Sequence, residues 1–392
     1  MSENIVLLTG GGDKPYALGM AGALTSAGVS LDFIGSDDLQ TPEMLGDPQI
    51  HFFNLRGDQR PDASVREKLF RVILYYVRLL RYAATAEPRI FHILWNNKFQ
   101  LFDRTLLMLY YKWLGKKTVL TVHNVNAGQR DANDSWLNRL SLKAQYHLVD
   151  HLFVHTDKMK RELLSTFSIP AGKVTVIPFG INNTVPNTNL STTEAKKAAG
   201  VNSTDKTVLF FGNIAPYKGL DYLVSAFLQL SKSDPSYHLL IVGKPKQRED
   251  YWNEIKQTIQ ESGSQHQIRQ KIEYIPDEET EIYFKAADVL ILPYSHVFQS
   301  GVLFLGYSFG LPAIVTDVGS LREEIVEGET GFVATPQDAS DLARAISCYF
   351  GSDLYRNLND RRRVIMQYAN DRYSWSKVAA VITNVYSGLL AA

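Results

Sequence analysis

Residues 207–224, TVLFFGNIAPYKGLDYLV, decide the fold class of this chain. An apolar run ends at Gly212, and a helical pattern begins at Lys218-Gly219. Such strand, glycine turn and helix units are typical of parallel sheets, because parallel strands need long crossover connections. A lysine beside a glycine loop and a helix N-terminus also favours an anion such as a diphosphate. A solvated lysine at a helix start would give the same pattern.

The same unit recurs along the chain on both sides of this stretch. In the first half, buried-strand patterns occupy residues 4–12, 29–36, 89–95, 116–124, 151–156 and 173–180. In the second half they occupy residues 207–213, 237–244, 271–276, 288–294, 311–319 and 330–336. Between the halves, residues 181–206 are rich in Asn, Thr and Ser, which is typical of a linker or domain edge. We therefore expect two doubly wound α/β domains that face each other across a cleft.

Composition narrows the function classes. The 392 residues contain 41 basic and 41 acidic side chains, so no overall field draws nucleic acid to the protein. The single cysteine, Cys348, excludes an internal disulfide or a cysteine zinc cluster, and its helical context predicts a packed position. We find neither a signal-peptide pattern nor an apolar run long enough for a membrane span, and expect a cytoplasmic protein.

Ligands of open α/β sheets bind beyond the carboxyl ends of the strands, so the residues there are the candidates. Gly11 and Gly12 follow the first strand, but Pro15 stands where a dinucleotide fingerprint needs its third glycine. We expect a ligand-facing loop here, with a plain tight turn as the alternative. His123 follows another strand and suits a sugar hydroxyl or a proton transfer, unless it is merely packed.

Strand ends of the second half offer further polar groups. Gly243 follows the run at 237–242, and Gln299-Ser300-Gly301 would present backbone amides at a helix start. Glu324 lies after the strand pattern at 311–319.

Three stretches carry a family resemblance. They are residues 210–224 (FFGNIAPYKGLDYLV), residues 306–333 (GYSFGLPAIVTDVGSLREEIVEGETGFV) and residues 176–182 (VIPFGIN). In this order and at these separations they resemble glycosyltransferase family 4, whose GT-B architecture has two Rossmann-like domains. The resemblance implies an acceptor-binding domain at 1–182, a nucleotide-sugar-binding domain at 183–374 and a helix at 375–392 that crosses back.

The resemblance also implies an activity: transfer of a sugar from a nucleotide-diphosphate donor with retention, without a metal and without a further cofactor. His123 and Lys218 would then be the catalytic residues. The donor would be bound by Gly11, Gly12, Gly212, Asn213, Lys218, Gly243, Gln299, Ser300, Gly301, Val302 and Glu324. Cell-surface polysaccharide or glycoconjugate biosynthesis would be the pathway class.

The chain departs from the family pattern near the donor. The paired glutamates of the family's E-x7-E motif are absent, and the arginine that accompanies the lysine is replaced by Asn213. We interpret this as a branch of the family with Gln299-Ser300-Gly301 in place of the first glutamate. A catalytically inactive relative that binds nucleotide sugars is the alternative. A nucleotide-sugar epimerase is a third interpretation, which the failed dinucleotide fingerprint disfavours.

The acceptor side is marked by residues 63–89, where apolar and basic side chains alternate at helical spacing. A basic amphipathic helix could lie on an anionic membrane and meet a lipid-linked acceptor, while a packed helix with a solvated basic face fits equally. A glycan acceptor is also consistent. Residues 104–117 repeat the pattern, and there we favour a core helix.

Overall fold

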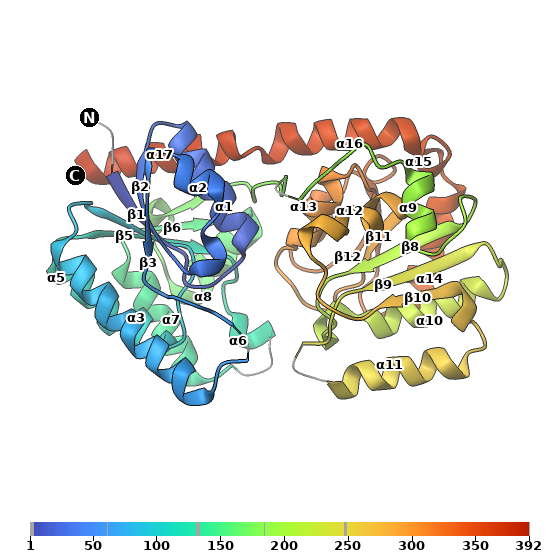
Figure 1. The fold of residues 1–392 in the computed structure, drawn as a ribbon, viewed down its shortest axis with the longest axis horizontal. Helices are drawn as coiled ribbons and strands as arrows, with labels where there is room; N and C mark the ends of the chain where they lie inside the picture. The colour runs from blue at the N-terminus through green and yellow to red at the C-terminus, as the bar shows by residue number, and fades with distance from the viewer. Residues whose placement is uncertain (1–3, 61, 131–133, 184, 247–248, 392) are drawn as a thin grey trace. The chain divides into compact units, whose positions relative to one another are not determined.

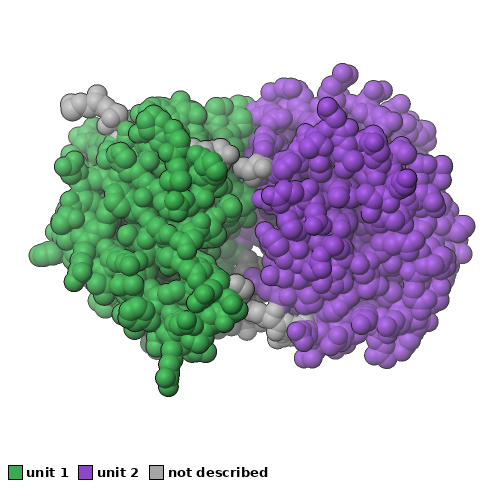
Figure 2. Space-filling model, in the orientation of Figure 1, with its two compact units in different colours: residues 1–180, 373–392 green, residues 181–372 purple. Residues whose placement is uncertain are grey.

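The computed structural model describes residues 4–60, 62–130, 134–183, 185–246 and 249–391. The chain forms two compact units, one of residues Met1–Gly180 with Tyr373–Ala392 and the other of Ile181–Arg372 (Figure 2). Each unit has a parallel sheet with helices on both faces (Figure 1). The predicted α/β class with two Rossmann-like domains is therefore confirmed.

The first unit is built on a seven-stranded sheet of order β3-β2-β1-β4-β5-β6-β7. Its strands are β1 (Asn4–Leu8), β2 (Ser30–Gly35), β3 (Ile50–Asn54), β4 (Ile90–Ile93), β5 (Lys117–Val122), β6 (His151–Val154) and β7 (Val174–Val176). Its helices are α1 (Lys14–Ser26), α2 (Pro42–Gly46), α3 (Val65–Thr85), α4 (Gln100–Arg104), α5 (Leu106–Trp113), α6 (Ala127–Arg130), α7 (Trp136–Leu148), α8 (Asp157–Phe167) and α17 (Trp375–Ala391).

The second unit has a six-stranded sheet of order β10-β9-β8-β11-β12-β13. Its strands are β8 (Lys206–Phe211), β9 (Tyr237–Val242), β10 (Ile268–Lys271), β11 (Val289–Leu292), β12 (Ala313–Thr316) and β13 (Gly331–Ala334). Its helices are α9 (Thr192–Ala198), α10 (Leu220–Ser231), α11 (Glu249–Glu261), α12 (Asp277–Ala286), α13 (Gly301–Ser308), α14 (Ala339–Gly351), α15 (Asp353–Arg356) and most of α16 (Leu358–Tyr373). Short 3-10 turns include η3 (Pro216–Lys218) and η5 (Leu321–Glu324).

Both sheets reverse their strand order beside the first strand of the unit, between β1 and β4 and between β8 and β11. Open α/β sheets bind ligands at this reversal, beyond the carboxyl ends of the strands. The loops after β1, β4, β8 and β11 are therefore the positions at which the fold places a ligand.

The C-terminal helix α17 belongs to the first unit. It lies beside α1 (Figure 1), and Val378, Ile382 and Tyr386 are buried in the same core as Ile5 and Leu31. Apolar side chains at i, i+4 and i+8 form the stripe that a helix needs in order to cover a sheet.

Two strand predictions differ from the structure. The strand predicted at 271–276 is observed at Ile268–Lys271, and β3 at Ile50–Asn54 was not predicted. Both β3 and β10 are edge strands that pair on one side only, and each has partly exposed side chains. An edge strand lacks the continuous apolar run by which a central parallel strand is recognised.

The prediction of a packed Cys348 is wrong, because its side chain is exposed on α14. Four buried residues of that helix, Leu342, Ala345, Ile346 and Tyr349, follow the i, i+3, i+4, i+7 spacing of one helix face, and the other two, Ala343 and Phe350, lie beside them. Cys348 falls outside this stripe.

Candidate functional site

The second unit brings Lys218 against the glycine that ends β8. Gly212 has φ +105°, and a Cβ placed on it would lie 2.9 Å from Lys218 Nζ. Lys218 itself is only 7% exposed, at the end of the turn η3. Gly219 follows with φ +65° and starts α10, so the turn that buries the lysine needs a left-handed residue.

Gly243 ends β9 beside the same loop. A Cβ on Gly243, whose φ is +140°, would lie 2.0 Å from the carbonyl oxygen of Gly212. The two strand ends therefore touch backbone to backbone, and no side chain fits between them. This close approach places Gly212 and Gly243 at one point of the sheet edge.

The start of α13 reaches the same point. Val302 Cγ2 lies 3.6 Å from the Cβ position of Gly212. Tyr294, which follows β11, has its ring 5.4 Å from Lys218 Nζ and its hydroxyl 3.1 Å from Ser300 Oγ. Because Ser300 is the N-cap residue of α13 and makes no capping hydrogen bond, its hydroxyl serves Tyr294 instead.

Gln299 precedes Ser300 in sequence and connects Glu324 to this group. The Gln299 amide donates to Glu324 Oε1 at 3.3 Å, and Glu324 is 5% exposed at the end of η5. Asn213 and Gly301, by contrast, are exposed. The structure thus gathers Gly212, Lys218, Gly243 and Val302, and connects Ser300 to them through Tyr294.

The glycine loop of the first unit is shaped by its own neighbours. Gly11 has φ +88°, and a Cβ there would lie 2.3 Å from Nη2 of Arg56. A Cβ on Gly12 would lie 1.9 Å from the ring of Trp95. These two glycines are therefore required for packing against Arg56 and Trp95, whether or not a ligand also approaches the loop.

His123 lies within an aromatic cluster beside this loop. Its ring stacks on Trp95 with centroids 4.2 Å apart and an interplanar angle of 5°, and it meets Tyr16 edge-on at 4.7 Å. Its Nδ1 lies 3.2 Å from Nε2 of His155. Burial, with added repulsion from His155 and His92, holds the pKa of His123 well below its usual range. At neutral pH the ring is an uncharged hydrogen-bonding group.

Sequence reasoning missed Trp95, His155, Tyr294 and Arg56. Trp95, His155 and Tyr294 follow β4, β6 and β11 by one or two residues, so a strand-end rule applied to every strand would have found them. Arg56 could not be found in this way, because the strand before it, β3, was not predicted.

The group in the second unit can stabilise negative charge. It combines a largely buried ammonium, two strand ends closed by glycines and the N-terminus of α13. Fixed donors of this kind act most strongly away from bulk water, where their electrostatic interactions are screened least. None of the helices in the described ranges is long and apolar enough to cross a membrane.

Comparison with protein-family models gives two adjacent matches. Residues 10–184 match the model described as Glycosyltransferase Family 4, and residues 191–367 match Glycosyl transferases group 1. The boundary between the two matches falls close to the boundary between the units at residues 180 and 181.

Among curated proteins, a D-inositol 3-phosphate glycosyltransferase of Corynebacterium aurimucosum is 24% identical over 70% of this chain and 65% of its own length. An uncharacterised glycosyltransferase of Methanocaldococcus jannaschii is 26% identical over 58% of this chain and 57% of its own. The chain thus spans a little less than two thirds of the curated relatives it matches.

Solved structures align over nearly the whole chain. Sucrose-phosphate synthase of Thermosynechococcus elongatus has a TM-score of 0.74 at 22% identity, with 99% of each chain covered. Anabaena Alr3699/HepE, in complex with UDP and glucose, has a TM-score of 0.75 at 16% identity, with 99% of this chain and 100% of that chain covered. These likenesses establish the fold and confirm the predicted GT-B class. Since the two family models together account for residues 10–184 and 191–367, the chain belongs to glycosyltransferase family 4.

Proposed function

We propose that this protein transfers a sugar from a nucleotide-diphosphate donor to a hydroxyl group of an acceptor. The observation that carries the proposal is the buried Lys218 against Gly212 at the carboxyl edge of the second sheet, beside the start of α13. Membership of the family supports it, and so does the UDP bound to the Anabaena neighbour.

In the proposed reaction the bond between the anomeric carbon and the β-phosphate breaks, and negative charge grows on the phosphate. Lys218 Nζ and the backbone amides at the start of α13 would stabilise that charge. His123, uncharged at neutral pH, would hydrogen-bond a hydroxyl of the transferred sugar.

We further propose that the transfer retains the anomeric configuration and that no metal takes part. We assign the role of covalent nucleophile to no carboxylate of this group; Glu324 accepts a hydrogen bond from the Gln299 amide. A front-face displacement, in which the leaving phosphate deprotonates the acceptor hydroxyl, needs no such nucleophile.

We propose that the acceptor binds the first unit. It would be a glycan or a lipid-linked molecule, and the reaction would belong to the synthesis of a cell-surface polysaccharide or glycoconjugate. Apolar side chains are unusually exposed on α3 and α5 there, namely Val65, Leu69, Phe70, Ile73, Leu106, Leu109 and Trp113. Contiguous exposed apolar residues beside basic ones suit a peripheral membrane contact. The exposure of Leu69 and Ile73 therefore favours the membrane interpretation of residues 63–89 over the packed helix.

The test is incubation of the purified protein with UDP-, GDP- and ADP-sugars, measuring both donor binding and release of nucleoside diphosphate. We expect one donor class to bind and to be turned over when an acceptor is supplied. Binding without release under any acceptor would favour the inactive relative, and failure to bind every donor would overturn the proposal.

A further inference from the structure

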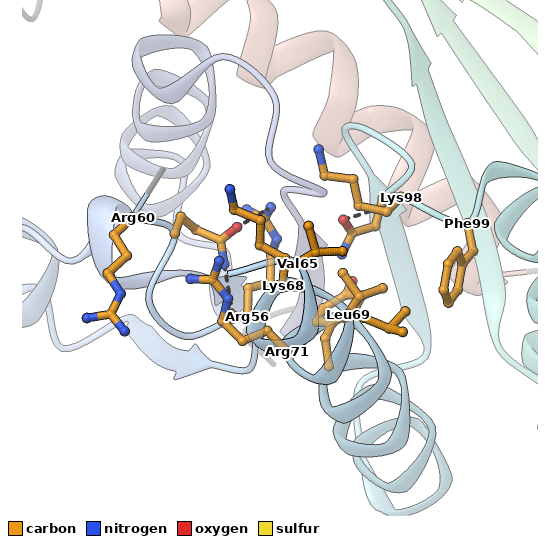
Figure 3. Close-up of a pocket in the computed structure, with 12 residues that line it drawn as sticks. Arg56, Arg60, Val65, Lys68, Leu69, Arg71, Lys98 and Phe99 are labelled. Carbon is orange, nitrogen blue, oxygen red and sulfur yellow. Dashed lines mark hydrogen bonds between the residues drawn. The ribbon is translucent and has the colours of Figure 1, made fainter. Parts of the chain in front are cut away.

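A pocket of about 400 Å³ in the first unit is lined by residues other than those of the glycine loop and the His123 cluster. Figure 3 shows these lining residues. The pocket is formed by the loop after β3, the first three turns of α3 and the loop after β4. Its lining residues are Arg56, Gln59, Arg60, Val65, Lys68, Leu69, Arg71, Val72, Tyr75, Asn97, Lys98 and Phe99. We call it the α3 pocket.

The lining of the α3 pocket carries five basic side chains and no acidic one. Arg60 pairs with Asp58 and Glu67, and Arg71 lies 3.8 Å from Asp58. The lining of the pocket is therefore positively charged, although the whole chain is neutral. Such a local concentration of one charge raises the concentration of anions of the opposite sign.

Arg56 is the most telling member of this set. It is 9% exposed, and among the described residues its guanidinium forms no ion pair. It donates to Ser36 Oγ at 3.0 Å and to Gln59 Oε1 at 3.4 Å, and both acceptors are uncharged. Burial lowers the pKa of the group. Asp38, which accepts a hydrogen bond from the same Ser36 hydroxyl, is an acidic group that acts on Arg56 from beyond that serine. A buried charge that contacts only uncharged acceptors is costly, so its presence needs an explanation.

The same arginine connects the pocket to the glycine loop. The 2.3 Å between Nη2 of Arg56 and the Cβ position of Gly11 means that the guanidinium rests on that loop. A group bound to Arg56 would therefore lie next to the loop at the carboxyl end of β1, where the sheet order reverses.

Apolar side chains complete the lining among the cations. Val65 is 81% exposed, Leu69 52% and Phe99 44%, and Figure 3 shows Val65 and Leu69 between Lys98 and Arg71. Charged and apolar walls together fit a ligand with an anionic group and a hydrocarbon or sugar body. The forked guanidinium of arginine fits phosphate oxygens bidentately.

We propose that the α3 pocket binds a phosphate or diphosphate group carried by the acceptor, and so selects acceptors by that charge. The identification of the ligand as an acceptor rests on the proposed function. The presence of an anion-binding site does not depend on it. The phosphate could belong to a lipid or to a soluble molecule, and the chemistry of recognition is the same for both.

The test uses the full chain and inorganic pyrophosphate as the probe, titrated by calorimetry. The parent protein carries Lys218→Ala, which removes the cation of the donor site as a competing anion site. We expect Arg56→Gln to weaken pyrophosphate binding about tenfold or more, as loss of a charge-assisted hydrogen bond predicts. The exposed Lys98→Gln should weaken it about threefold.

The matched control is Arg161→Gln, an exposed arginine of α8 outside the pocket lining, which should leave binding unchanged. Absence of pyrophosphate binding in the parent, or equal affinity for the Lys98→Gln, Arg56→Gln and Arg161→Gln variants, would overturn the proposal. Should Arg56→Gln fail to fold, the comparison of Lys98→Gln with Arg161→Gln still decides.

Vesicles separate the two sources of the phosphate. Phosphatidylcholine vesicles with and without phosphatidic acid are added to the pyrophosphate titration. If only the vesicles with phosphatidic acid compete with pyrophosphate, and if Lys98→Gln removes this competition, the phosphate belongs to a lipid. Pyrophosphate binding without vesicle competition assigns a soluble one.

Donor binding is measured on the same pocket variants with Lys218 restored. Donor binding that survives in Arg56→Gln, while pyrophosphate binding is lost, supports the pocket. If the wild type binds no donor, the proposed function is wrong. The anion site is then still tested separately by the pyrophosphate titration.

Discussion

At the scale of single residues, Lys218 carries the donor proposal most directly. Its Nζ is largely buried against Gly212, so the charge has been removed from water in a place that favours an anion. Lys218→Ala should weaken nucleotide-sugar binding by about 1.5–3 kcal/mol, the value of one hydrogen bond to a charged group. Donor titration measures this, and unchanged affinity would show that Lys218 does not meet the diphosphate.

Gly12 tests whether the glycine loop supports His123. A methyl group at this position would lie 1.9 Å from the Trp95 ring, and that ring stacks on His123. Gly12→Ala should therefore displace the cluster, costing about 1–3 kcal/mol in the free energy of unfolding and lowering the transfer rate. Denaturant unfolding and steady-state rates measure the two effects.

Gly22 offers the matched control for that substitution. It lies in α1, and a Cβ there meets nothing within 4 Å. Gly22→Ala should stabilise the protein by about 0.5–1 kcal/mol, because alanine loses less backbone entropy in a helix. Equal destabilisation by both substitutions would contradict the packing argument.

At the scale of elements, the first turn of α3 determines where the side chains of the α3 pocket lie. Ser64 and Glu67 form a capping box that fixes the first turn, and this turn holds Val65 and Lys68 at the α3 pocket. Helix nuclei are costly to form, so a cap that fixes the first turn also fixes the side chains on it.

Ser64→Ala should cost about 1 kcal/mol of stability and also weaken pyrophosphate binding to the α3 pocket. The comparison is Ser191→Ala, which removes the equivalent capping box of α9 in the second unit. Thermal unfolding should report similar losses for both, whereas calorimetry should report weaker anion binding only for Ser64→Ala. Equal anion binding in the two variants would separate the cap from the pocket.

At the scale of the whole molecule, acid should destabilise the first unit. Burial lowers the pKa of His92 to about 3 and those of His151 and His155 to about 4, from 6.5. The unfolded state therefore binds more protons than the folded state between these values, and stability falls as the pH drops below 6.5. For His155 alone the loss at pH 5 is about 2 kcal/mol.

Asp103 acts in the opposite direction, because burial raises its pKa to about 6 from 3.8. Its contribution to the free energy of unfolding therefore falls as the pH rises between these two values. Three histidines oppose this one carboxyl group, so we expect a net loss of stability from pH 7 to pH 5. Trp252→Phe removes the tryptophan of the second unit and leaves four in the first, which makes fluorescence specific for the first unit. A midpoint of urea unfolding that does not fall between pH 7 and pH 5 would contradict the prediction.

The sequence by itself determined the two doubly wound domains. Central parallel strands are buried on both faces, so their continuous apolar runs can be recognised without knowing which strands pair. It also placed Gly212, Lys218, Gly243 and Ser300 at strand or helix ends, which is a local property of the chain.

Only the tertiary structure decided which of these ends meet. Contacts such as Gly243 against the Gly212 carbonyl join residues far apart in sequence, and no periodicity records them. The edge strand β3 has half-exposed residues, so its hydrophobic pattern is weak. The loop after β3 positions Arg56 against Gly11, where Arg56 lines the α3 pocket. A neutral composition conceals this charge, because the basic residues of the pocket gather only when β3, α3 and the loop after β4 are packed together.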